Sequence, residues 1–68
     1  MPFDPSTITT EAKLDCAKRE LAMRRAVYPK RVRTGQMSRD DFEREVALMR
    51  AIVEDYTDRL RTEGGLLV

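Results

Sequence analysis

The sequence predicts an all-α fold, a two-helix antiparallel hairpin with a proline kink or break in its first helix. Two glycine-free segments rich in helix-forming residues flank Gly35, and their apolar residues recur at spacings of three and four. No segment shows the alternating pattern of a strand. The 68 residues allow one small domain, with residues 1–10 as an N-terminal arm, 11–63 as the helical hairpin and 64–68 as a C-terminal tail.

The N-terminal arm contains two helix-start signals. Asp4 stands directly before Pro5, and Thr10 stands directly before Glu11. Asp and Thr side chains cap helix starts, and proline is favoured in a first helical turn. We therefore expect a short turn after Asp4 and the start of the main helix at residue 11.

The first helix is predicted to cover residues 11–28 and to be interrupted at Pro29. Proline has no N–H to donate, and its ring crowds the carbonyl four residues earlier, which here belongs to Arg25. A short helix is expected over residues 29–34. Gly35 follows it, and glycine readily adopts the left-handed conformation that closes a helix.

The second helix is predicted over residues 38–62 and has the clearest start signal in the chain. Ser38 followed by Asp41 resembles a capping box, with Asp in place of the usual Glu. Met37 and Phe42 occupy the two positions of a hydrophobic staple. The Gly64–Gly65 pair is expected to end the helix.

Apolar residues form one stripe on the second helix and two on the first. The second-helix stripe consists of Phe42, Val46, Met49, Val53, Tyr56 and Leu60, widened by Leu48 and Ile52. The first-helix stripes are Leu14, Ala17, Leu21, Tyr28 and Val32 on one side and Ala12, Cys16, Met23 and Val27 on the other. Because a hairpin covers only one side of each helix, we predict a homodimer that forms a four-helix bundle. The alternative is that the second stripe binds a different protein.

The composition argues against catalysis. The chain has no histidine, one cysteine and no glycine-rich phosphate loop, so it lacks a Cys/His zinc site, the commonest general base and a nucleotide cradle. We expect no enzyme activity, no catalytic residue, no cofactor and no metal. Cys16 is expected to be a buried packing thiol. The combined dimer and hairpin core is predicted to consist of Leu14, Cys16, Leu21, Met23, Val27, Phe42, Val46, Met49, Ile52, Val53, Tyr56 and Leu60.

Charge is divided unevenly along the chain, although 13 basic and 12 acidic residues give a net charge of only +1. Residues 1–36 carry eight basic and four acidic side chains, and residues 37–68 carry five and eight. We predict a partner-binding surface that contains Arg24, Arg25, Tyr28 and Arg31, because arginine and tyrosine are enriched at interface hot spots. Pairing of the basic helix with the acidic helix and a core role for Tyr28 are competing interpretations. Nucleic-acid binding is a further alternative, which the low net charge disfavours.

The sequence predicts a cytoplasmic protein with no membrane partner and no small-molecule substrate. Its apolar runs are only a few residues long, and its single cysteine cannot form an intramolecular disulfide. The first ten residues, MPFDPSTITT, have neither the basic nor the apolar region of a signal peptide.

Residues 20–56 contain a distinctive segment, MRR-x-VYP followed by G-x-M. The full pattern runs through Glu20, Met23, Arg24, Arg25, Val27, Tyr28, Pro29, Val32, Gly35, Met37, Glu45, Met49, Ile52, Asp55 and Tyr56. This segment resembles a group of small, mostly uncharacterised helical proteins encoded by tailed phages and prophages. The chain departs from the group at Phe42, where a small residue is frequent.

The resemblance implies a phage or prophage origin and a location in the host-cell cytoplasm, but no established activity. Small phage proteins of this kind often dock onto a host protein and inhibit or modulate it. We therefore expect an accessory protein that acts by protein–protein binding and modulates or inhibits a host protein. A nucleic-acid-associated factor that uses the basic first helix and a structural small subunit of a larger assembly are the alternatives.

Overall fold

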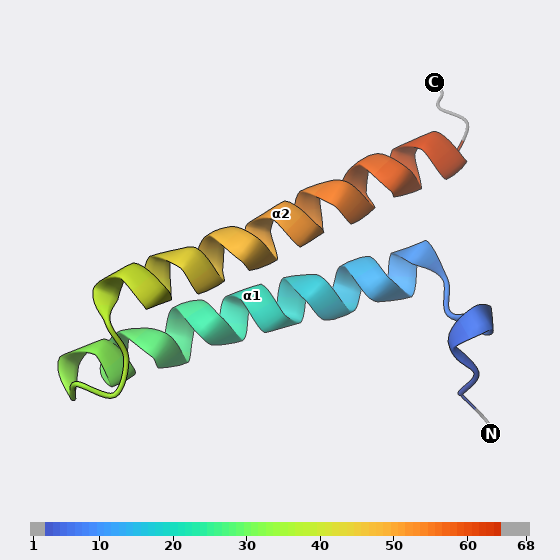
Figure 1. Cartoon of the computed structure of the whole chain (residues 1–68). Coiled ribbons are helices and arrows are strands. Elements are labelled where there is room, and N and C mark those ends of the chain that lie inside the picture. Colours follow the sequence, from blue (N-terminus) through green and yellow to red (C-terminus); the bar gives the residue numbers. More distant parts are fainter. Residues whose placement is uncertain (1–2, 65–68) are drawn as a thin grey trace.

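Two antiparallel helices lie side by side and are joined by a short turn (Figure 1). The computed structural model describes residues 3–64. Within them, a 3-10 helix, η1, covers Pro5–Thr7, α1 covers Thr10–Arg33 and α2 covers Arg39–Glu63. The predicted all-α hairpin is confirmed, and the described part of the chain contains no strand.

The arm before α1 is a capped turn, as predicted. The carboxylate of Asp4 accepts hydrogen bonds from the backbone N–H and the hydroxyl of Ser6, both at 2.9 Å. These bonds favour the charged carboxylate, so the pKa of Asp4 is lowered from its ordinary value. Ile8 follows in an extended conformation and leads the chain into α1.

α1 begins one residue earlier than predicted, and Thr9 caps it in place of Thr10. The Thr9 hydroxyl accepts a hydrogen bond from the backbone N–H of Ala12 at 3.0 Å. Thr10 is the first helical residue, and its hydroxyl donates to a carboxylate oxygen of Glu63 at 2.7 Å. Thr10 therefore joins the first turn of α1 to the last turn of α2, a contact that the local sequence does not reveal.

α1 runs without interruption through Pro29, so the predicted division into helices 11–28 and 29–34 is wrong. Proline removes one intrahelical hydrogen bond, the one that the carbonyl of Arg25 would accept. Arg25 is an exposed residue, and water satisfies helix carbonyls that lack a partner where it can reach them. The final turn is closed again by the N–H of Thr34, which donates to the carbonyl of Lys30 at 3.0 Å. A kink at Pro29 stays a prediction.

Gly35 closes α1 in the left-handed conformation, with φ of +79°. The N–H of Gly35 donates to the carbonyl of Val32 at 3.2 Å, and the N–H of Gln36 donates to that of Arg31 at 2.8 Å. These two bonds define a Schellman motif, which satisfies the last carbonyls of the helix and reverses the chain. The predicted role of Gly35 is confirmed.

The predicted cap of α2 is confirmed at Ser38, whose hydroxyl accepts a hydrogen bond from the N–H of Asp41 at 3.0 Å. The Asp41 carboxylate accepts a bond from Arg44 at 2.8 Å. Met37 and Phe42 are both half-buried. At the other end, the N–H of Gly64 donates to the carbonyl of Leu60 at 2.9 Å. The predictions for Gly65 and the tail 66–68 lie outside the described residues.

The buried side chains lie in the seam between the helices. Among the described residues, the buried apolar side chains are Leu14, Ala17 and Met49. The half-buried apolar and aromatic residues along the helices are Leu21, Tyr28, Val32, Phe42, Val46, Val53, Tyr56 and Leu60. The six main residues of the predicted α2 stripe are therefore at least half-buried, whereas Leu48 and Ile52, which were predicted to widen it, are exposed.

The hairpin is a single layer of two helices. Its principal extents are 45 × 34 × 14 Å, and one helix with its side chains is about 10–12 Å across. The Cα radius of gyration is 15.2 Å, against about 11 Å for a compact chain of this length. No further helix within residues 3–64 covers either face of the layer.

We predict that Ser38→Ala lowers the free energy of unfolding by about 0.5–2 kcal/mol, because the N–H of Asp41 loses its acceptor. Urea denaturation at a fixed protein concentration measures the change. Thr62→Ala is the matched control, because the Thr62 hydroxyl is exposed and bonds only within its own helix. An equal urea midpoint for Ser38→Ala and the wild type would contradict the role of the cap.

Candidate protein-interaction face

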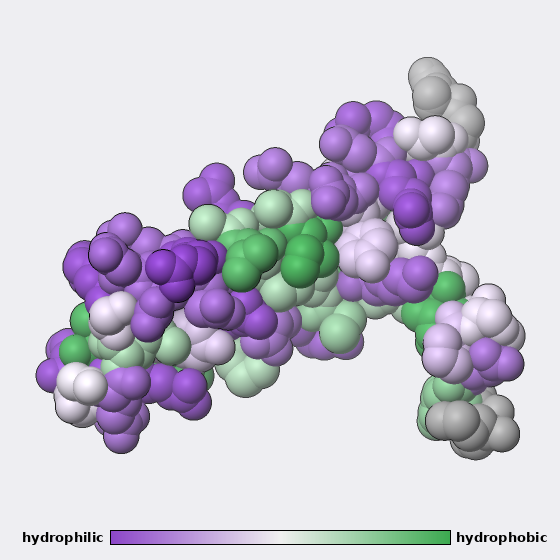
Figure 2. All heavy atoms as spheres, viewed as in Figure 1, coloured by the Kyte–Doolittle hydropathy of each residue, from purple (hydrophilic) through white to green (hydrophobic). Residues whose placement is uncertain are grey.

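One broad side of the hairpin exposes a group of apolar side chains. Figure 2 shows hydrophobic residues gathered near the middle of the hairpin, with hydrophilic residues around them and between them and the N-terminal arm. We call it the apolar face and define it as Ile8, Ala12, Cys16, Met23, Val27, Leu48 and Ile52. Its α1 members are the second stripe predicted from the sequence, which the hairpin leaves uncovered.

Helix geometry places these residues on the same side of the layer. The α1 members recur after four, seven and four residues, so they share one flank of a helix with 3.6 residues per turn. Leu48 and Ile52 are four residues apart and share one flank of α2. Cys16 and Ile52 line the same groove, which shows that the two flanks face the same way.

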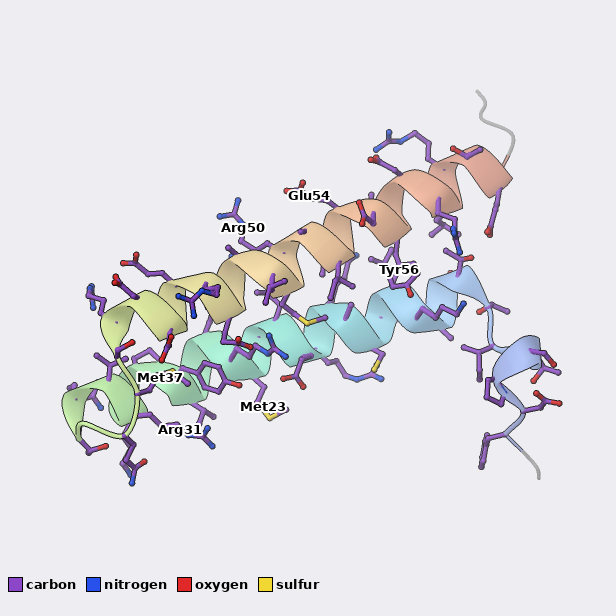
Figure 3. All side chains as sticks on the ribbon, in the orientation of Figure 1. Met23, Arg31, Met37, Arg50, Glu54 and Tyr56 are labelled. Atoms are coloured by element: carbon purple, nitrogen blue, oxygen red, sulfur yellow. The ribbon has the colours of Figure 1, made fainter. Side chains whose placement is uncertain are left out.

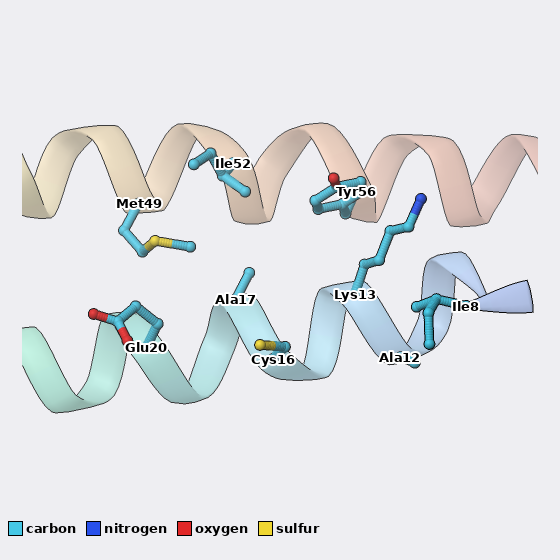
Figure 4. A pocket seen from close by; sticks show the side chains of 9 residues that line it. All are labelled: Ile8, Ala12, Lys13, Cys16, Ala17, Glu20, Met49, Ile52 and Tyr56. Atoms are coloured by element: carbon cyan, nitrogen blue, oxygen red, sulfur yellow. The ribbon is translucent and has the colours of Figure 1, made fainter. Parts of the chain in front are cut away.

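The groove lies between α1 and α2 at the centre of the apolar face (Figure 4). Its walls are formed by Ile8, Ala12, Lys13, Cys16, Ala17, Glu20, Met49, Ile52 and Tyr56. The ammonium group of Lys13 lies 5.9 Å from the centre of the Tyr56 ring, at a distance that allows a cation–π contact. Of the nine lining residues, two are charged, Lys13 and Glu20.

Exposure of the apolar face is high for residues of this kind. Met23 is 54% exposed and Leu48 is 50% exposed, and Val27 and Ile52 are 40% and 38% exposed. Scattered exposed apolar residues are normal on protein surfaces, but a contiguous patch marks an interaction site. The predicted core therefore falls into two groups, one in the seam and one on this face.

Arg24 connects the two helices at the edge of the groove. Its guanidinium donates to a carboxylate oxygen of Glu20 at 2.9 Å, and across the seam to the carbonyl and a carboxylate oxygen of Glu45 at 2.9 and 3.2 Å. The hydrogen bond to Glu20 and the nearby negative charges raise the pKa of Arg24 above its ordinary value. We call these three residues the Arg24 clamp. Arg24 was predicted for partner binding, and the structure places it in this intramolecular contact.

The other predicted partner-binding residues lie on the C-terminal half of α1. Arg25 and Arg31 are exposed, and Tyr28 is half-buried. The guanidinium of Arg31 lies 5.2 Å from the centre of the Tyr28 ring, and Figure 3 shows Arg31 close to the turn that joins the helices. With Lys30 and Arg33 these two arginines form a cluster that we call the basic end of α1.

Cys16 is exposed, so the prediction of a buried packing thiol is wrong for the single chain. The reason is geometric, because α2 covers the flank of α1 that contains Leu14 and Ala17, and Cys16 lies on the uncovered flank. Within residues 3–64 no cluster of three or more His, Cys, Asp or Glu could hold a metal ion. None of the described helices combines the length and the apolar character needed to span a membrane.

Ion pairing leaves the charges of the two helices largely separate. Arg39 pairs with Glu43, Arg44 with Asp41 and Arg61 with Asp58, all exposed and all within α2. Among the described residues, the ion pair between the helices is that of Arg24 with Glu45. Pairing of the basic helix with the acidic helix within one chain is thus limited to the clamp.

No family model, curated protein or solved structure matches this chain. Sequence reasoning missed two contacts, the Arg24 clamp and the bond from Thr10 to Glu63. The spacing of Glu20 and Arg24 was a signal for half of the clamp, because residues four apart on a helix can pair. No local signal identifies Glu45 or Glu63.

We predict that Arg24→Ala lowers the free energy of unfolding by about 1–2 kcal/mol, because it removes hydrogen bonds to two carboxylates and a carbonyl. Arg25→Ala is the matched control, since Arg25 is the exposed neighbour, and we expect it to change stability by less than about 0.5 kcal/mol. Urea denaturation of both variants compares them. Equal losses in the two variants would show that the clamp does not stabilise the hairpin.

Proposed function

We propose that this protein is a small accessory protein that acts by binding other protein chains and that it works as a homodimer. The apolar face is the observation that carries the proposal. Among the described residues, the seam buries three apolar side chains, and the face exposes five large ones. Covering such a surface with another apolar surface lowers the free energy and so favours association.

The total surface of the chain supports an interface of ordinary size. The accessible surface is 5299 Å², whereas a compact monomer of 7.9 kDa exposes about 4400 Å² by the usual scaling with mass. The excess is about 900 Å². A standard protein interface buries about 800 Å² on each partner. The surface that one copy exposes beyond that of a compact monomer is therefore about as large as the surface that one interface would bury.

The single layer supports a second copy as the first partner. Stable domains contain at least two packed layers around one core, and this hairpin has one layer. In a twofold dimer the same patch occurs on both chains, so an apolar face necessarily meets another apolar face. Two hairpins stacked in this way form a four-helix bundle.

The basic end of α1 supports a second, different partner. Arg25 and Arg31 are exposed, and arginine binds carboxylates through a planar fork of donors. This region overlaps the segment that resembles small phage proteins. We infer that the dimer presents its two basic ends to an acidic surface of a host protein, which it modulates or inhibits.

We expect the purified protein to show a mass of about 16 kDa by light scattering, twice the 7.9 kDa of one chain. Ile52→Glu should raise the dimer dissociation constant at least about 100-fold, because it would bury an unpaired charge at a cost of about 3 kcal/mol or more. Ala47→Glu is the control, since Ala47 is exposed beside Arg50 and Glu54, which point away from α1 (Figure 3). A wild-type monomer at low micromolar concentration would contradict the dimer.

We expect the double variant Arg25→Ala/Arg31→Ala to remain a helical dimer and to lose the host protein that the wild type captures. Affinity capture from host lysate with quantitative mass spectrometry measures the loss, and circular dichroism and light scattering verify the fold. Arg50→Ala/Arg61→Ala removes the same charge from α2 and should retain the captured protein. Equal capture by both double variants would show that the basic end of α1 is a solvated surface only.

A further inference from the structure

We propose that two copies pair through their apolar faces so that α1 of each chain packs on α2 of the other, with the twofold axis parallel to the helices. The inference rests on the proposed homodimer and specifies its geometry. The occupant of the apolar face is thus a second copy of this chain in one orientation.

Two hairpins can be stacked face to face with twofold symmetry in two principal ways. If the axis lies perpendicular to the helices in the interface plane, α1 packs on the partner's α1, and α2 packs on the partner's α2. If the axis runs parallel to the helices, α1 packs on the partner's α2. Every neighbouring pair of helices is antiparallel in both arrangements. The two arrangements bury the same faces and differ in which charges they bring together.

The charges of the helices favour the parallel axis. α1 has eight basic and three acidic side chains, a net charge of +5, and α2 has five basic and eight acidic side chains, a net charge of −3. Packing α1 on the partner's α2 gives each basic helix two acidic neighbours. Packing like on like would place two +5 helices side by side, and juxtaposed like charges oppose association. Within residues 3–64 of one chain a single ion pair joins the helices, so most of these charges remain available to the partner.

The parallel axis also fixes which residues meet. Such an axis leaves every residue of the partner at its own height along the bundle, so the contacts within one hairpin give the heights. Lys13 lies beside Tyr56, and Arg24 binds Glu45. By interpolation, Cys16 lies within about half a turn of the height of Ile52. Cys16 therefore faces the partner's Ile52.

The same interpolation brings Met23 to within about 3 Å of the height of the partner's Leu48. The two pairings place Cys16 and Met23 of each chain against Ile52 and Leu48 of the other chain. Glu20 also lines the groove, but its carboxylate already accepts a hydrogen bond from Arg24 at 2.9 Å. Burying this face therefore leaves the charge of Glu20 paired.

Disulfide trapping tests the arrangement. Wild-type chains, whose single thiol is Cys16, are mixed with Cys16→Ser/Ile52→Cys chains, allowed to exchange and oxidised with diamide, which accepts the two electrons and two protons of the thiol pair. We expect a disulfide that joins one chain of each kind as the main product. Each protein alone should give little disulfide, because identical residues then lie diagonally across the bundle, beyond the reach of a disulfide.

The control mixture replaces the second chain by Cys16→Ser/Ala47→Cys, whose thiol lies on the outward side of α2. Met23→Cys and Leu48→Cys, each in the Cys16→Ser background, form a second test pair that leaves Ile52 intact. Dimers that give no more mixed disulfide in either test pair than in the control would overturn the proposed arrangement. Monomers by light scattering would instead contradict the homodimer itself.

Discussion

The seam between α1 and α2 is the constraint on which the rest of the structure depends, because two helices can bury only the flanks that they turn toward each other. That seam accommodates Leu14, Ala17 and Met49 and one stripe of each helix. α1 has apolar residues on two flanks, so pairing with α2 leaves the second flank exposed. The apolar face is the direct result, and a hairpin of any other register would also leave one apolar flank of α1 exposed.

The Arg24 clamp places a permanent charge inside this seam. An arginine held by two carboxylates contributes less stability than its contacts suggest, because all three groups lose water. Its geometry is directional, however, and an apolar stripe alone would allow the helices to slide by a turn. The clamp sets the height of α1 against α2, and it thereby aligns the members of the apolar face that the two helices contribute.

Local rules predicted the hairpin, the caps at Asp4 and Ser38, the role of Gly35 and the α2 stripe, because each depends on residues within one or two turns. They failed where tertiary contacts decide. Thr10 bonds to Glu63 across the seam, and Arg24 bonds to Glu45, partners 53 and 21 residues away in the chain. The break at Pro29 was predicted from one lost hydrogen bond, but the helix tolerates that loss near its end. The two stripes of α1 predicted an interface, but periodicity does not identify its occupant.

Because the hairpin is one layer thick, the fraction of chains that are folded depends on the concentration of the protein. A hairpin that buries three apolar side chains among its described residues has little to oppose the entropy of the unfolded chain. If the second layer comes from another copy, folding becomes bimolecular, and mass action sets the folded fraction. Dilute chains would then be open to proteases, and chains made in quantity would survive. Such a protein would act above a threshold of synthesis and disappear soon after synthesis stops, without any dedicated degradation signal.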